Sequence, residues 1–463
     1  MAPLARSQLK RQVSRAVTSS SSKSKFPSAY WIAFLVALVL CWSPFKLAAY
    51  LAPWIGILVM LLVTRSKQIL IRLLLIFAIW MIILPIYAII TPGFVWHSAL
   101  LSLFTYGTFV FVLTIPTKPL ADKSLCDKIL VTARWVLLFE SIWGIVQGVV
   151  GFMQSGTFDI SNGDNVAGTI RPFTVAPDFS NAMFAVNVAI LLLLLLPSLI
   201  QENKGRLPFM LGCVALILAS VVHVLIFLAI SLLITTLIFH PSFPKYRYGI
   251  FLITILVIGT FWTFVFLPRN LSTLGAFVEQ TINRETPRAR VVESILNDAV
   301  YRYPWLVFIG VGPGQFSSRA GLIGTGMYFG GPANPLQIPL LPTGMSEVFE
   351  RYVIDIWLQM SFSSNPNDTS STYKPFFSWL SIFVEGGILA VLIVLSVLMR
   401  LIWMIRATAN QPSHRLRSIA LASGIMFIAM LGIQENYWEV SQAIFVGVIM
   451  LQVCYSVLRY TRS

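Results

Sequence analysis

The sequence predicts an all-α integral membrane protein with about 12 transmembrane helices and one large extracytoplasmic loop between helices 9 and 10. The composition is 57% hydrophobic and only 11% charged over 463 residues, which lies outside the range of soluble globular domains. Apolar runs of about 17–25 residues, the length that an α-helix needs to cross a hydrocarbon core, recur along the chain. Basic residues gather in the short connections between these runs, as they do in cytoplasmic loops.

Twelve apolar segments are the predicted crossings. Two stretches, 29–64 and 207–239, are too long for one helix at about 1.5 Å per residue and short for two. Since the basic residues in 6–25 and in 65–67 should share the cytoplasmic side, an even number of crossings must separate them. The same rule divides the second stretch. The segments are 29–43, 47–64, 69–90, 95–115, 131–153, 181–200, 207–221, 223–239, 248–267, 376–399, 416–433 and 440–458.

The predicted topology places both termini in the cytoplasm and the chain in the cytoplasmic (inner) membrane. About 23 of the 33 Lys and Arg residues lie in or beside the inner connections. The net charge of +15 therefore indicates topology and affinity for anionic membrane lipid, and no nucleic-acid partner is expected.

Four regions follow from this topology. Residues 1–28 are basic and serine-rich without an apolar core, so we expect a disordered cytoplasmic tail and not a signal peptide. Residues 29–267 hold helices 1–9, residues 268–375 form the large extracytoplasmic loop, and residues 376–463 hold helices 10–12. A loop of this length among short connections is usually functional.

The loop contains the glycine-rich stretch GVGPGQFSSRAGLIGTGMYFGGPANP, residues 310–335. Backbone that is not helical must be wet or buried in protein, so we expect the loop to cap the bundle outside the lipid. The glycines could form an anion-binding nest of backbone amides. The preferred interpretation is a turn that folds the loop back onto the bundle, because GVGPGQ lacks the lysine and Ser/Thr of a phosphate-binding P-loop.

Most positive charges predicted outside are arginines, although topology disfavours positive charge there. A guanidinium holds phosphate in a bidentate manner, which suits a lipid-linked pyrophosphate at the membrane surface. Arg171 precedes the sixth predicted helix, Arg288 and Arg290 lie on a predicted short helix, and Arg319 follows the first loop glycines. Surface ion pairs with nearby acids are the alternative interpretation for Arg288 and Arg290.

Two acids fall within predicted crossings. Glu385 lies some nine residues into the tenth helix, and an ionisable group inside a crossing is a functional hypothesis. Tyr373 and Lys374, at the end of the loop, could pair with it. For Glu140 in the fifth helix we expect a structural pairing with Arg134 or Gln147.

The last outer turn, QENYWE at 434–439, carries Tyr437 and Trp438. These rings could stack on a sugar or form part of an aromatic belt at the membrane interface, and the belt is the preferred interpretation.

The four cysteines, Cys41, Cys126, Cys213 and Cys454, are scattered singly, with no CxxC pair and no nearby histidine cluster. This pattern predicts neither a disulfide framework nor a zinc site. No metal and no cofactor are expected.

Three segments resemble motifs of the O-antigen polymerase and O-antigen ligase superfamily of bacterial membrane proteins. TIRPFTVAPDFSNAMF (169–184) resembles the family's arginine-containing segment before a mid-chain helix. PWLVFIGVGPGQF (304–316) is similar to its G-x-G-x-x-x-F signature in the large loop, and FFSWLSIFVEGG (376–387) to its Glu-x-Gly segment in the next helix.

The resemblance implies a membrane-embedded glycosyltransferase of the GT-C type that uses undecaprenyl-diphosphate-linked glycan as donor, without nucleotide sugar or metal. Arg171 matches the family's arginine before the helix, and Arg288 or Arg290 its loop arginine, which would stabilise the departing diphosphate. Glu385 could take the acceptor's proton, as could Glu347 or Glu350. The candidate substrate-binding residues are Arg319, Tyr373, Lys374, Glu347 and Glu350.

The expected partners are the lipid-linked glycan and membrane lipid, with a chain-length regulator and a flippase as candidate protein partners. Phe376 stands where the ligases carry a histidine, and ASVVHVLIF stands in place of the family's Ser-Arg pair. These departures favour a polysaccharide polymerase over a ligase. A lipid-linked oligosaccharide flippase should show two repeated halves, which this sequence lacks, and a non-catalytic scaffold would not need clustered outer arginines.

Overall fold

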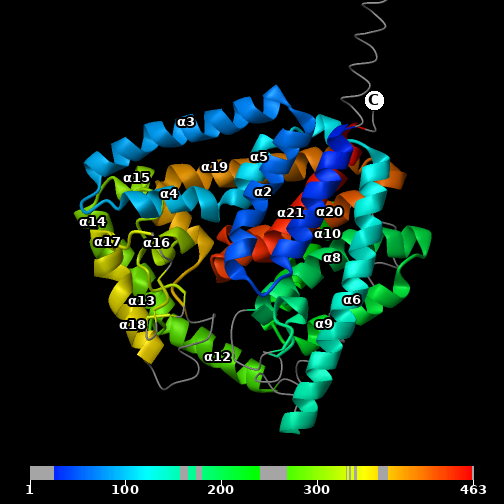
Figure 1. Cartoon of the computed structure of the whole chain (residues 1–463). Coiled ribbons are helices and arrows are strands. Elements are labelled where there is room, and N and C mark those ends of the chain that lie inside the picture. Colours follow the sequence, from blue (N-terminus) through cyan, green and yellow to red (C-terminus); the bar gives the residue numbers. More distant parts are fainter. Residues whose placement is uncertain are drawn as a thin grey trace, which may run out of the picture.

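The computed structural model describes residues 25–156, 165–173, 180–239, 268–329, 331–332, 335–337, 341–362 and 374–460. All regular secondary structure within these residues is helical (Figure 1). The helices pack into a bundle, and the smaller helices of residues 268–362 cover one side of it.

Seven helices in the described ranges are long and apolar enough to cross a membrane. They are α2 (Lys46–Thr64), α3 (Lys67–Ile90), α6 (Lys123–Ser155), α8 (Ser180–Glu202), α19 (Ser378–Thr408), α20 (Pro412–Gln434) and α21 (Ser441–Tyr460). The count becomes eight if α4 (Trp96–Thr105) and α5 (Gly107–Thr114), which are bent by 59°, form one broken span. This arrangement is consistent with a multi-pass membrane protein.

Three shorter apolar helices accompany them: Lys25–Cys41, α9 (Arg206–Leu218) and α10 (Val222–Ile238). Eleven of the twelve predicted crossings therefore coincide with a helix or with the bent pair, and the segment 248–267 lies outside the described residues. The prediction of an all-helical membrane protein is confirmed at this level. The count of twelve is not, because only the seven or eight spans above meet the length requirement within the described residues.

The centre of the bundle is formed by α8, α20 and α21. The most apolar window of α8 is 83% buried and that of α21 is 89% buried, whereas only 6% of the window of α3 is buried. A helix that is apolar on all sides needs either protein or lipid around it. We therefore assign protein surroundings to α8 and α21, and a lipid-facing position at the edge of the bundle to α3.

The region 268–375 has a small apolar core of its own, which continues into α19. Phe376, for example, is 2% exposed and packs edge-on against Trp357 at 5.7 Å between ring centroids. Its elements are α12 (Pro268–Ile282), α13 (Pro287–Ser294), π-helix η4 (Ile295–Ala299), α14 (Val300–Arg302), α15 (Leu306–Ile309), α16 (Arg319–Gly324), α17 (Glu347–Phe349), π-helix η5 (Glu350–Ile354) and α18 (Asp355–Phe362). This region is thus a folded layer against the bundle.

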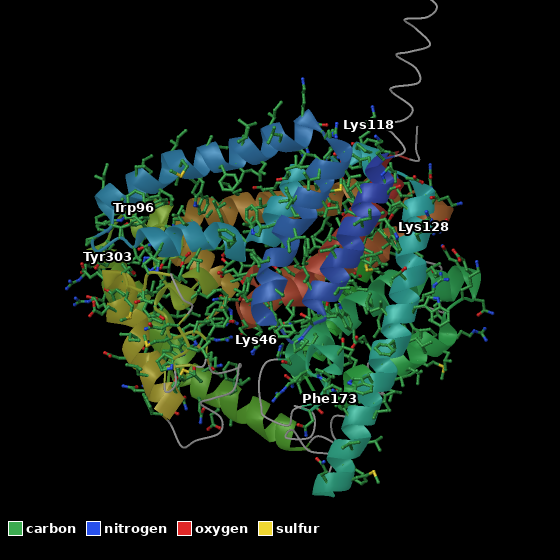
Figure 2. The ribbon with its side chains drawn as sticks, in the orientation of Figure 1. Lys46, Trp96, Lys118, Lys128, Phe173 and Tyr303 are labelled. Carbon is green, nitrogen blue, oxygen red and sulfur yellow. The ribbon has the colours of Figure 1, made fainter. Side chains whose placement is uncertain are left out.

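The remaining 3-10 turns are η1 (Lys118–Leu120), η2 (Gly168–Ile170) and η6 (Tyr437–Glu439). Lys118 and Lys128 lie toward one end of the bundle, and Lys46 and Phe173 lie toward the other (Figure 2).

The interpretation of Tyr437 and Trp438 as an aromatic belt is wrong. Tyr437 is 0% and Trp438 4% exposed, so neither ring reaches a membrane interface or a sugar. The Trp438 indole donates to the Ile428 carbonyl, and the Tyr437 hydroxyl lies 2.9 Å from Nε2 of His223. A buried Trp or Tyr needs a partner for its polar atom, and the bundle interior supplies one here.

Candidate anion-binding site

The glycine-rich stretch docks against a break in α19. Gly387 has φ +67°, which interrupts the helix. The carbonyl of Val384 then accepts from the N–H of Val311 at 2.9 Å, and that of Glu385 accepts from Gly312 at 3.0 Å. A Cβ added at Gly310, where φ is +79°, would lie 2.3 Å from the backbone of Glu385. Only glycine fits at this crossing of two backbones.

The Glu385 side chain completes this junction. It is 6% exposed and accepts hydrogen bonds from the backbone N–H groups of Gly314 at 2.7 Å, Phe316 at 3.1 Å and Ser318 at 3.4 Å. The backbone N–H groups of the loop converge as they do in an anion-binding nest. The anion that they bind is the carboxylate of Glu385, which belongs to the chain itself. The preferred interpretation of a turn folded onto the bundle is therefore confirmed. The geometry favours Glu385 as the residue that holds this turn, because both of its oxygens already accept backbone N–H groups.

Arg319 begins α16 directly after this turn and is 5% exposed. Its guanidinium forms an ion pair with Glu435 and donates to the hydroxyl of Tyr328 at 3.1 Å. Its backbone N–H donates to Glu439 at 2.7 Å. Because Glu435 and Glu439 lie in the connection between α20 and α21, Arg319 fastens the loop region to the bundle with a buried charge pair.

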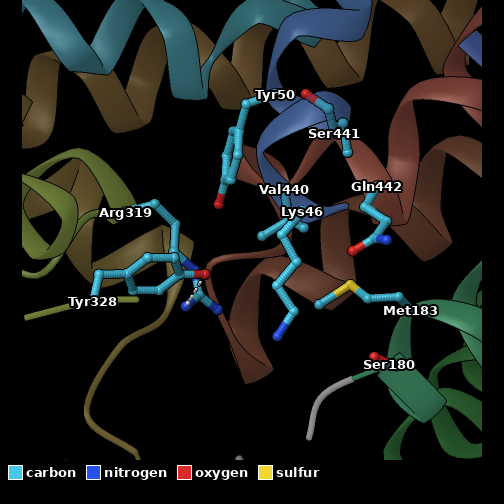
Figure 3. A pocket seen from close by; sticks show the side chains of 10 residues that line it. Lys46, Tyr50, Ser180, Met183, Arg319, Tyr328, Val440, Ser441 and Gln442 are labelled. Atoms are coloured by element: carbon cyan, nitrogen blue, oxygen red, sulfur yellow. Dashed lines mark hydrogen bonds between the residues drawn. The ribbon is translucent and has the colours of Figure 1, made fainter. Parts of the chain in front are cut away.

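A small hollow lies beside Arg319 (Figure 3). The first residues of three long helices line it: Lys46 of α2, Ser180 of α8 and Ser441 of α21. The N-terminus of a helix carries a partial positive charge and N–H groups without intrahelical acceptors. Three such ends and Lys46 therefore give the hollow the character of an anion site, to which Arg319, whose charge is paired with Glu435, adds the N–H of its Nε. The other lining residues are Ala49, Tyr50, Met183, Tyr328, Val440 and Gln442.

Two buried polar atoms at the hollow lack a hydrogen-bond acceptor or donor within the described part of the chain. They are the hydroxyl of Tyr50, a residue that is 7% exposed, and Nε of Arg319. The Tyr50 ring points into the hollow toward Arg319 and Tyr328 (Figure 3). Most buried polar groups in proteins have a partner. Nε of Arg319 is therefore available to a ligand or to water, as is the Tyr50 hydroxyl, which lies near the hydroxyl of Tyr328.

Lys374 and Arg288 form a second layer of positive charge. The Arg288 guanidinium donates to the carbonyls of Lys374 at 3.0 and 3.2 Å and of Gln434, and lies 5.0 Å from the centre of the Phe377 ring. Arg288 thereby fixes the backbone of Lys374. Burial lowers the pKa of Lys374 to about 8; Glu435 opposes this shift, whereas Arg319 and Lys46 add to it. Lys374 thus lies within electrostatic range of the hollow.

Glu439 is fully buried. Burial raises the pKa of its carboxyl to about 8, with Glu385 adding to the shift and Arg319 opposing it. The carboxyl is therefore mostly protonated near pH 7, and it cancels little of the positive charge around it.

Three other predicted site residues are not among those that line the hollow. Arg171 is half-buried and follows η2, where its carbonyl accepts from Gln147 at 2.9 Å. Arg290 is exposed. Glu347 accepts from the Tyr303 hydroxyl at 2.7 Å.

Of the remaining predicted residues, Glu350 and Glu140 lie in the described part of the chain. Glu350 is exposed, and Tyr373 lies outside the described residues. The predicted pairing of Glu140 with Arg134 or Gln147 is wrong. The Glu140 carboxylate accepts instead from the backbone N–H of Thr169 at 2.8 Å and from the Thr169 hydroxyl at 2.5 Å.

The structure thus brings three predicted site residues together: Arg319, Lys374 and Arg288. It adds Lys46 and Tyr50, which were not predicted as site residues. The sequence gives one indication of Lys46, because the predicted topology places this lysine on the side where positive charge is disfavoured. Tyr50 follows it by four residues, a spacing that places both side chains on one face of a helix.

Comparison of the chain with family models, curated proteins and solved structures finds no match. A function can therefore be argued only from the residues and the geometry above.

Proposed function

We propose that the chain is a membrane-embedded glycosyltransferase that polymerises oligosaccharide repeat units carried on undecaprenyl diphosphate, at the outer face of the cytoplasmic membrane. One observation carries the proposal: the starts of α2, α8 and α21 meet at a hollow with Lys46 and Arg319. A diphosphate suits this site because it offers several negative oxygens to N–H groups and cations that converge on one place.

In the proposed reaction the donor diphosphate lies in the hollow. The acceptor hydroxyl attacks the anomeric carbon, a glycosidic bond forms, and the bond from that carbon to the diphosphate oxygen breaks. The hydroxyl proton passes to the departing undecaprenyl diphosphate. Negative charge grows on the diphosphate as the old bond breaks, and Lys46, Arg319 and the three helix ends stabilise it. The Tyr50 hydroxyl donates a further hydrogen bond to a phosphate oxygen. A diphosphate leaves readily, so the leaving group needs no general acid.

The proposal includes the predicted topology, with twelve crossings, both termini in the cytoplasm and residues 268–375 outside. In that topology the segments that begin near residues 47, 181 and 440 all start from the outer side. The meeting of Lys46, Ser180 and Ser441 at one hollow agrees with this topology, which puts all three helix starts on one side, and it supports the proposal. The hollow would then open where a lipid-linked donor presents its diphosphate.

The test is the size distribution of lipid-linked and surface glycan in a strain that lacks the gene and expresses Lys46→Ala. A polymerase predicts loss of long chains while single repeat units still reach the surface. Lys67→Ala is the matched control, because Lys67 is also the first residue of a long helix, α3, but does not line the hollow. This control should give wild-type glycan, with both variants present at equal levels in the membrane.

Other outcomes would replace the proposal. Long chains that accumulate on the lipid carrier would identify a ligase, and repeat units trapped inside the cell would identify a flippase. Normal long chains from both Lys46→Ala and Lys46→Glu would rule out the hollow as the diphosphate site.

A further inference from the structure

Two of the four cysteines meet at the other end of the bundle. Cys126 lies in the first turn of α6 and Cys454 in the C-terminal half of α21. Their sulfur atoms are 3.8 Å apart, although the residues are 328 positions apart in the sequence. Both are free thiols, as are Cys41 and Cys213. Scattered cysteines in the sequence gave no sign of this pair.

The pair lies close to the polar boundary of the bundle. Cys126 is 8% exposed, and its chain neighbours Ser124 and Asp127 are exposed. Arg417, which pairs with Glu202 at 3.6 Å, lies within electrostatic range of both thiols, and the nearby Asp127 opposes its effect on Cys126. A nearby cation and partial access to water are features of reactive cysteines.

We propose that Cys126 and Cys454 form a redox-active dithiol, which a peroxide oxidises to a disulfide that joins α6 to α21. One thiol attacks the peroxide oxygen, which gives a sulfenic acid and, from hydrogen peroxide, one water. The other thiol then attacks the sulfenic sulfur, the disulfide forms and a second water leaves. The two sulfurs lose two electrons in total, and the peroxide accepts them.

The geometry requires little movement. The sulfurs must close from 3.8 Å to about 2.05 Å, which rotation about two Cα–Cβ bonds can supply when the two helices already pack together. In the predicted topology this end faces the cytoplasm, where thiols stay reduced until an oxidant appears.

The position of the pair gives the disulfide a structural consequence. The start of α21 lines the hollow, and Gln147 of α6 holds the segment 167–171 through four hydrogen bonds. The disulfide would therefore couple, at their far ends, two helices that frame the outer side of the bundle. This inference does not depend on the proposed function.

The experiment treats the purified full chain in detergent with hydrogen peroxide, blocks remaining thiols with N-ethylmaleimide under denaturing conditions, and maps peptides by mass spectrometry. We expect the number of alkylated cysteines to fall from four to two and a peptide pair that joins Cys126 to Cys454. Cys126→Ser and Cys454→Ser should each abolish this pair. Cys41→Ser and Cys213→Ser are the matched controls and should retain it.

Three results would overturn the proposal: four alkylatable cysteines after oxidation, an intermolecular disulfide in place of the internal one, or loss of the cross-link in Cys41→Ser or Cys213→Ser. The serine variants must elute as monodisperse protein before oxidation. A variant that fails this requirement is replaced by the corresponding alanine.

Discussion

The loop region contacts the bundle at two places that use polar groups in opposite ways. At the glycine-rich junction, the carboxylate of Glu385 and the carbonyls freed at Gly387 are matched by backbone N–H groups. At the hollow, the Tyr50 hydroxyl and Nε of Arg319 lack partners within the described residues. The glycine-rich junction, which resembles a sequence motif, therefore stabilises the fold. The hollow, whose residues form no motif, offers polar groups to a ligand.

An energetic difference underlies this contrast. A buried donor or acceptor without a partner costs about 1–3 kcal/mol of folding stability. Such groups are therefore uncommon where side chains serve only the fold. Substitutions at the junction should therefore act on stability, and substitutions at the hollow should act on ligand affinity.

The largest effect is expected for Gly310→Ala. The added Cβ would lie 2.3 Å from the backbone of Glu385, so the crossing must open, and we expect a loss of more than about 4 kcal/mol of stability or no folded protein. The measurement is thermal unfolding in detergent, followed by thiol-reactive dye fluorescence. Gly156→Ala is the control, because its φ is also positive, at +71°, but its Cβ meets nothing within 4 Å.

Gly156→Ala should cost only about 1 kcal/mol, the usual cost of a left-handed conformation. Equal losses for the two variants would mean that backbone conformation, and not the crossing with α19, explains the requirement for glycine.

Glu385→Gln comes next. A glutamine amide presents N–H groups to backbone N–H groups, so the variant loses acceptors for Gly314 or for Phe316 and Ser318. We expect a loss of about 2–3 kcal/mol in the same unfolding assay. Glu347→Gln, at a partly exposed carboxylate, should change stability by less than about 0.5 kcal/mol. Full stability of Glu385→Gln combined with loss of glycan polymerisation would instead support Glu385 as the base.

The sequence predicted the fold better than the site, and particular residues show why. Hydropathy and charge identify helices because burial in lipid or protein depends on local composition, as for α3 and α8. The break at Gly387 depends on where Gly310 crosses α19, which no local pattern contains. Arg319 is predicted from its charge on the outer side, yet Lys46 and Tyr50, which line the hollow beside it, come from the other end of the chain.

A smaller effect concerns pH. As the pH rises through about 8, Lys374 loses its positive charge and Glu439 gains a negative charge, because their pKa values are both about 8. Both changes make the hollow less positive. We expect the affinity for undecaprenyl diphosphate in nanodiscs to be highest below pH 8 and to fall about tenfold between pH 7 and 9.

Lys374→Arg sharpens this prediction, since arginine keeps its charge throughout this range. The variant should retain more of its affinity at pH 9 than the wild type. An affinity that is constant from pH 7 to 9 would show that the bound anion lies beyond the influence of Lys374 and Glu439.

The smallest effect is expected for Tyr50→Phe. The ring keeps its packing and only the hydroxyl without a partner is removed, so stability should stay constant or rise slightly. The affinity for undecaprenyl diphosphate should fall about fivefold, the equivalent of one hydrogen bond of about 1 kcal/mol. Tyr303→Phe is the control, because its hydroxyl donates to Glu347 in the loop region, and it should leave affinity unchanged. If Tyr50→Phe destabilised the chain and left affinity intact, the hydroxyl would serve the fold through a bound water, and the contrast between junction and hollow would not hold at this residue.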